Sequence, residues 1–126
     1  MKPVCLVIGA GAGIGGTVGR RFAKEGYHSV LCRRSDEEGL KRLVLNIKED
    51  GNDATGFLLN AAKDNTIEER VSQVESEVGP IEVVVFNLGA QVGNRTLEET
   101  AYKVFELGWR MATFALFRAA SSVCPL

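Results

Sequence analysis

The sequence has few of the residues that point to a disulfide-stabilised or metal-binding protein. It contains three cysteines, one histidine and three prolines among 126 residues. Cys5, Cys32 and Cys124 are widely spaced and form no C-x-x-C pair, so we expect reduced thiols rather than a disulfide framework or a zinc site. The single histidine, His28, cannot build a metal site alone, and we expect it at the entrance of a strand.

Neither charge nor hydrophobicity is concentrated in one part of the chain. The 15 basic and 16 acidic side chains leave a net charge of −1, which gives no reason to expect nucleic acid or a membrane surface as a partner. The apolar runs are far shorter than the roughly 20 residues that span a bilayer. No signal peptide is recognisable after Met1. We therefore expect a cytoplasmic protein that forms a single domain over residues 1–126.

Four short apolar runs predict four strands. The first run, Pro3–Ile8, is continuous rather than alternating, which is typical of a parallel sheet covered by helices on both faces. Amphipathic segments follow the runs, so the expected order is β-α-β-α-β-α-β-α. Because parallel strands are joined by right-handed crossovers, this order predicts an α/β fold with a doubly wound Rossmann-type sheet of strand order 3-2-1-4. The predicted strands are Pro3–Ile8, Ser29–Cys32, Thr55–Leu59 and Ile81–Phe86.

The first and last helices are predicted from the spacing of apolar residues. Ile14, Val18 and Phe22 recur every fourth residue and indicate one buried face of a helix that ends near Gly26. The last helix is expected over Glu98–Val123 and has apolar residues around much of its circumference.

The two middle helices are predicted from their starts. Ser35 with Glu38, and Thr66 with Glu69, have the spacing of a capping box, in which each side chain satisfies a backbone N–H group of the first turn. Gly51 is expected to end the second helix.

A glycine-rich turn joins the first predicted strand to the first predicted helix. It runs from Gly9 to Gly16 and includes the pattern G-x-G-x-x-G at Gly11, Gly13 and Gly16. Glycine lets the backbone approach phosphates closely, and a helix N-terminus offers free N–H groups and a partial positive charge. The turn therefore predicts a pyrophosphate site; the alternative is a glycine-rich loop without a ligand.

The finer spacing of this turn resembles the short-chain dehydrogenase/reductase family. The family's T-G-x-x-x-G-I-G is matched by Ile8–Gly15 apart from Ile8, and its N-N-A-G element is half matched by Phe86–Gly89. The resemblance implies the NADP(H)-binding part of an oxidoreductase that transfers hydride to or from a carbonyl or alcohol substrate. It also implies that Asn60 contacts adenine and that Asn87 and Gly89 approach the nicotinamide-side ribose. The implied cofactor-binding residues outside the second strand are Gly9, Gly11, Ala12, Gly13, Ile14, Gly15, Asn60, Ala61, Asn87 and Gly89.

Two arginines after the second predicted strand favour NADP(H) over NAD(H). An NAD site usually has an acidic residue at the end of this strand, whereas this chain has Cys32 followed by Arg33 and Arg34. A guanidinium fork matches a 2′-phosphate that a carboxylate would repel. The alternative is that one of the arginines stacks on adenine or faces solvent.

The catalytic residues of the family are not recognisable in this chain. Neither Tyr27 nor Tyr102 has a lysine four positions later, and aligning the family's G-T-F with Ala112–Phe114 puts Trp109 at the position of a catalytic asparagine. Trp109 donates a hydrogen bond but cannot accept one, so it cannot replace that asparagine in a proton relay. The alternatives are a local slip of the alignment or a packing role for Trp109. Whether the chain is an enzyme is left open. A non-catalytic NADP(H)-binding module is the second hypothesis, and another Rossmann protein such as a methyltransferase the third.

The chain resembles only about the first half of a typical family member. The expected fifth strand is missing, so the fourth strand would be an apolar edge, which favours association. We therefore expect either a fragment or a homo-oligomer that associates through the last helix.

Overall fold

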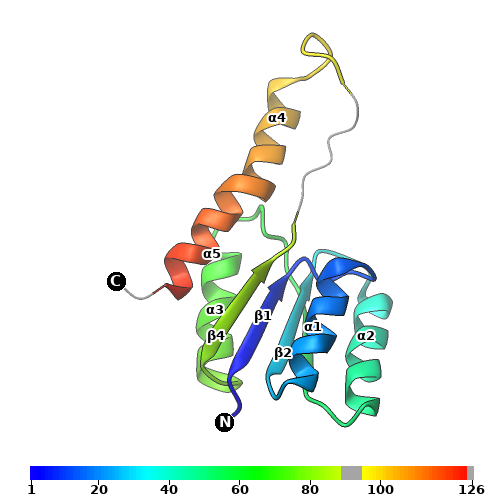
Figure 1. The fold of residues 1–126 in the computed structure, drawn as a ribbon. Helices are drawn as coiled ribbons and strands as arrows, with labels where there is room; N and C mark the ends of the chain where they lie inside the picture. The colour runs from blue at the N-terminus through cyan, green and yellow to red at the C-terminus, as the bar shows by residue number, and fades with distance from the viewer. Residues whose placement is uncertain (89–94, 125–126) are drawn as a thin grey trace.

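The computed structural model describes residues 1–88 and 95–124 (Figure 1). Strands and helices alternate in it along the first two thirds of the chain, and helical segments complete the last third. The elements are β1 (Val4–Ile8), α1 (Ile14–Lys24), β2 (His28–Arg33), α2 (Glu37–Glu49), β3 (Ala54–Leu58), α3 (Thr66–Glu77), β4 (Ile81–Phe86), α4 (Tyr102–Trp109), η1 (Arg110–Phe114) and α5 (Ala115–Val123).

The four strands form one parallel sheet in the order β3-β2-β1-β4. This confirms the predicted sheet and its strand order. β1 lies between β2 and β4, and every residue of it is at most 2% exposed. His28 is the first residue of β2, as expected for a histidine at a strand entrance. The strand bounds differ from the predicted ones by no more than one residue at either end.

Helices cover both faces of the sheet, as predicted. Side chains alternate between the faces of a strand, so β1 contributes to two separate cores. Val4, Leu6 and Ile8 belong to the core that includes residues of α3 and α5, whereas Cys5 and Val7 belong to the core that includes residues of α1 and α2. Figure 1 shows α1 and α2 on one side of the sheet and α3 with α5 on the other.

The predicted capping boxes are wrong in both middle helices. α2 is capped by Asp36, whose side chain accepts a hydrogen bond from the Gly39 N–H group at 3.1 Å. Asp36 has φ 59°, a left-handed conformation that aspartate tolerates, and this shifts the cap one residue beyond Ser35. At the start of α3, Thr66 donates its hydroxyl to the Asn60 and Lys63 carbonyl oxygens, so it stabilises the preceding loop instead of capping the helix.

The first and last helices also differ from the predictions. Ile14 is 70% exposed although its spacing predicted a buried face, because it stands at the first position of α1, beside the glycine turn. The last helix begins at Tyr102 rather than at Glu98. A turn closed by the Thr100 N–H group on the Leu97 carbonyl precedes it, and the five residues of η1 widen it into a π-helix in the middle.

Large apolar side chains are exposed along α4 and α5. In Figure 1, α4 extends away from the sheet while α5 lies beside α3. No helix in residues 1–88 and 95–124 combines the length and the apolar character needed to cross a membrane. Association of two copies through this surface stays a prediction. The exposed side chains include Tyr102, Phe105, Leu107, Trp109, Leu116 and Phe117.

Candidate dinucleotide-binding site

The carboxyl ends of the strands bring the predicted site residues to one edge of the sheet. The Ala10 N–H group donates to the Cys32 carbonyl at 2.9 Å, which ties the turn after β1 to the end of β2. The Leu59 N–H group donates to the Arg33 carbonyl at 2.7 Å, and the Asn87 N–H group donates to the Ile8 carbonyl at 2.8 Å. Ligands of open parallel sheets bind outside the carboxyl ends of the strands, where the strand order reverses. The glycine turn, Arg33 and Asn87 therefore lie at the edge of the sheet that binds ligands in open parallel sheets.

Three glycines of the turn are required by the fold itself. Gly9 has φ +97°, and a Cβ atom there would overlap the Asn87 carbonyl oxygen of the neighbouring strand end. A Cβ atom at Gly15 would overlap the Gly9 carbonyl oxygen, and one at Gly16 would overlap the Gly11 carbonyl oxygen. These glycines let α1 start directly against the turn, so their small size serves close packing.

Gly11 and Gly13 have no such packing requirement. Among residues 1–88 and 95–124, a Cβ atom at Gly13 would meet nothing within 4 Å, and one at Gly11 would meet only the Arg33 guanidinium at 4.0 Å. Gly13 is the N-cap of α1, yet no side chain caps this helix within the described chain and its first turn carries no acidic residue. Ala12 and Ile14 beside it are exposed. The free N–H groups and the open space fit a phosphate at this helix start.

Alternation along β2 decides which side chain faces the coenzyme side. Cys32 is 1% exposed and lies in the core beneath α3 and α5, and burial raises the pKa of its thiol to about 12. Arg33 follows it and therefore points to the opposite face, towards α1 and α2. Cys32 is therefore a packing residue, and Arg33 is the side chain at the end of β2 on the side of α1 and α2.

The Arg33 guanidinium lies between the glycine turn and the start of α2. Its Nη2 atom is 4.0 Å from the point where a Cβ atom would stand on Gly11, and its Nη1 atom is 2.6 Å from the corresponding point on Gly39. Nη2 also lies 3.3 Å from Asp36 Oδ2, and the Arg33 side chain is 21% exposed. Gly39 therefore leaves the space that the guanidinium needs beside the first turn of α2.

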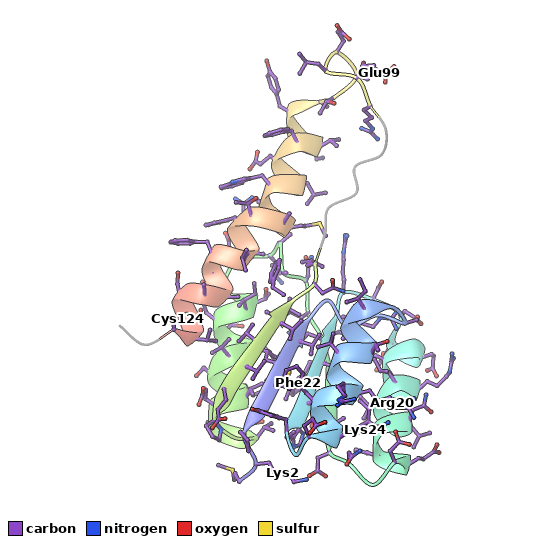
Figure 2. The ribbon with its side chains drawn as sticks, viewed as in Figure 1. Lys2, Arg20, Phe22, Lys24, Glu99 and Cys124 are labelled. Carbon is purple, nitrogen blue, oxygen red and sulfur yellow. The ribbon has the colours of Figure 1, made fainter. Side chains whose placement is uncertain are left out.

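A cavity of about 320 Å³ lies next to this guanidinium, between α1 and α2. Three arginines and one aspartate line it, which gives the charged lining a net charge of +2. Arg20 lies on α1 (Figure 2) and lines this cavity. Its Nη2 atom is 2.7 Å from Oδ2 of Asp50, the residue after α2. The lining residues are Ala12, Gly16, Thr17, Arg20, Arg33, Asp36, Gly39, Arg42, Leu43 and Asn46.

Arg20 and Arg42 line this cavity although the sequence did not single them out, whereas the role of Arg34 stays a prediction. Arg34 is exposed and is not one of the residues lining this cavity. A signal for Arg42 was available, because positions 39, 42, 43 and 46 share one face of a helix, and all four line the cavity. Arg20 joins them only because α1 packs beside α2, which no local pattern reveals.

The remaining predicted residues lie at the ends of β3 and β4. Asn60 is exposed, and its Oδ1 atom accepts a hydrogen bond from the Ala62 N–H group at 3.1 Å, while Ala61 is buried. Asn87 is exposed and its Nδ2 atom lies 3.5 Å from the Gly9 carbonyl oxygen. Gly89 lies outside the described residues. The contacts of Asn60 with adenine and of Asn87 with ribose stay predictions.

Three aromatic residues considered at the sequence level have packing roles or face solvent. Tyr27 packs edge-on against Phe22 with ring centroids 5.3 Å apart, and Tyr102 is 95% exposed. Trp109 stacks on Phe114 with centroids 5.0 Å apart and planes 5° from parallel. This stacking across η1 favours the interpretation of Trp109 as a packing residue.

Comparison with known proteins identifies the family. The family model described as short chain dehydrogenase matches residues 3–126. A putative ketoacyl reductase of Streptomyces coelicolor is 38% identical over 95 residues, which covers 75% of this chain and 36% of that relative.

Two solved structures are similar in fold and sequence. A variant of actinorhodin polyketide ketoreductase with NADPH superposes with a TM-score of 0.87 at 32% identity, covering 97% of this chain and 46% of that chain. A gluconate 5-dehydrogenase from Burkholderia cenocepacia in complex with NADP and tartrate gives a TM-score of 0.83 at 25% identity, covering 96% and 47%. This chain therefore spans less than half the length of each of these proteins. Because the family model covers nearly all of its residues, the chain belongs to the short chain dehydrogenase family.

Proposed function

We propose that this chain binds NADP(H) in preference to NAD(H), as the coenzyme-binding part of an oxidoreductase. The observation that carries the proposal is the position of the Arg33 guanidinium, between Gly11 and Gly39, at the wall of a cavity whose lining carries a net charge of +2, with Arg20 paired to Asp50 outside the lining. A phosphate ester carries a charge of about −1.5 to −2 near neutral pH, so the cavity matches the 2′-phosphate that distinguishes NADP from NAD.

The chain's own residues would hold the coenzyme at two points. The uncapped N-terminus of α1, beside Gly11 and Gly13, would receive the pyrophosphate through its free N–H groups. Arg33 and Arg42 would receive the 2′-phosphate through charge-assisted hydrogen bonds. When bound, the coenzyme supplies the hydride that is exchanged with a carbonyl or alcohol. The printed names of the ketoreductase with NADPH and the dehydrogenase with NADP support this choice of coenzyme.

A non-catalytic NADP(H)-binding module is the second candidate. The observation that favours it is the placement of both tyrosines, since Tyr27 packs on Phe22 and Tyr102 is 95% exposed on α4. Edge-on packing and a solvent-facing position are not the settings of a general acid held within hydrogen-bond reach of its substrate. Turnover with a panel of carbonyl compounds separates the two candidates when it is measured on the oxidoreductase of which this chain would be a part, because a non-catalytic module binds NADPH without oxidising it.

Single arginine substitutions test the coenzyme preference. We expect Arg33→Ala to weaken NADPH binding by about 10- to 100-fold, the loss of a charge-assisted contact of roughly 1.5–3 kcal/mol, and to leave NADH binding nearly unchanged. Arg34→Ala is expected to change the affinities for the two coenzymes equally. Arg21→Ala is the charge-matched control, because Arg21 pairs with Glu25 and is 74% exposed. Equal losses of NADPH and NADH in Arg33→Ala, measured by calorimetric titration, would overturn the proposal.

A further inference from the structure

A carboxylate already engages the guanidinium assigned to the 2′-phosphate. Asp36 Oδ2 lies 3.3 Å from Arg33 Nη2, and Oδ1 of the same side chain accepts a hydrogen bond from the Gly39 N–H group at 3.1 Å. Asp36 also lines the cavity between α1 and α2. Asp36 is therefore the one carboxylate among the described charged residues that line this cavity; the others are arginines.

The two ends of the Arg33 fork have different surroundings. Nη1 is packed towards the first turn of α2, 2.6 Å from the Cβ position of Gly39, so a ligand cannot approach it from that side. Nη2 is the end that lies nearer the glycine turn, 4.0 Å from the Cβ position of Gly11. Nη2 is therefore the end of the fork on the side of the proposed coenzyme site, and it is also the atom that Asp36 engages.

Resting on the proposed function, we propose that Asp36 is a specificity-determining residue that limits the preference for NADP(H). Its carboxylate competes with the 2′-phosphate for Nη2 of Arg33 and repels the phosphate in the same cavity. NAD(H) carries a hydroxyl at this position, so its binding is not subject to this competition. The affinity for the 2′-phosphate is accordingly lower than Arg20, Arg33 and Arg42 would give without Asp36.

The capping role of Asp36 can be separated from its charge. Asparagine caps helices as well as aspartate does and also tolerates the left-handed conformation, φ 59° here. Asp36→Asn therefore keeps the hydrogen bond to Gly39 and removes only the charge. Glycine adopts this conformation freely and is only a few tenths of a kcal/mol poorer as a cap, so Asp36→Gly provides a second variant without the carboxylate.

The test uses two small probes that differ in the 2′-phosphate alone. Adenosine 2′,5′-bisphosphate and adenosine 5′-monophosphate are titrated calorimetrically into the wild type, Asp36→Asn and Asp36→Gly at low salt. We expect both variants to bind the bisphosphate about fivefold more tightly, the effect of one unit charge at contact distance in water, and the monophosphate as the wild type does. Glu37→Gln is the matched control: its exposed carboxylate pairs with Lys41 at 3.5 Å and does not line this cavity, so we expect less than a twofold change.

The outcomes separate this inference from the proposed function. If the wild type binds the bisphosphate no better than the monophosphate, the proposed coenzyme preference fails and this inference fails with it. If the wild type prefers the bisphosphate but the Asp36 variants bind it equally or more weakly, only the role of Asp36 is overturned. An equal gain for both probes also overturns it, because the competition concerns the 2′-phosphate alone. Thermal midpoints within about 2 °C of the wild type verify that the variants are folded.

Discussion

The contrast between Gly13 and Gly15 predicts two different consequences of adding one methyl group to the same turn. A Cβ atom at Gly13 meets nothing within 4 Å in the part of the chain that the structure describes, whereas one at Gly15 overlaps the carbonyl oxygen of Gly9. In Gly13→Ala the cost to folding is that of a poorer N-cap, at most about 1 kcal/mol. In Gly15→Ala the start of α1 must move away from the turn, and overpacking of this kind costs about 1–3 kcal/mol.

Gly13→Ala, the variant with the smaller cost to folding, is expected to have the clear defect in coenzyme binding. The new methyl group at Gly13 projects into the space assigned to the pyrophosphate, so we expect NADPH to bind at least tenfold more weakly, a loss of about 1.4 kcal/mol. Urea unfolding gives the stability of each variant, and calorimetric titration gives its affinity. Wild-type affinity for NADPH in a folded Gly13→Ala protein would refute the assignment of this space to the coenzyme.

Two further predictions concern β2 and test the fold rather than the site. Burial lowers the pKa of His28, partly opposed by the charge of Asp53, so the folded state favours the neutral ring that contacts Thr55 Oγ1 at 2.8 Å. The stability that this shift contributes is fully present above the unfolded pKa of about 6.5 and is lost as the pH falls through that value towards the folded pKa. The urea midpoint of the wild type is therefore expected to fall over this pH range, and that of His28→Gln is expected to fall less. Ser29 is fully buried and donates to the Gly19 carbonyl at 2.6 Å, so Ser29→Ala is expected to lower the unfolding free energy by about 1 kcal/mol in urea titrations; no change would show that water replaces the hydroxyl.

The sheet could be predicted from the sequence chiefly because its central strands, β1 and β2, are buried on both faces. Burial of β1 on both sides requires an unbroken apolar run, and this signal is local and strong. The glycine turn was equally readable, since Gly9 and Gly15 are fixed by contacts that any parallel strand–turn–helix unit with this spacing makes. Helix starts were less predictable, because the left-handed conformation of Asp36 is not encoded in the capping-box spacing of Ser35 and Glu38.

The cationic cavity could be predicted only in part. Arg33 was readable as an arginine at the end of a buried strand. The difference between Arg33 and Arg34 depends on the direction in which each side chain leaves the backbone where β2 ends. Arg20 and Arg42 come together through the packing of α1 against α2, a tertiary contact without a local pattern. The π-helical η1 was likewise not predictable, since the sequence around it has ordinary helical spacing.

The measurement that tests the central claim most directly is a paired calorimetric titration of the wild-type chain with NADPH and with NADH. The position of Arg33 and the net charge of +2 in the neighbouring cavity predict that NADPH binds more tightly, by at least about tenfold at low salt. They also predict that this advantage shrinks as salt is added, because the added contact is electrostatic. Equal affinities for the two coenzymes, or tighter binding of NADH, would contradict the account.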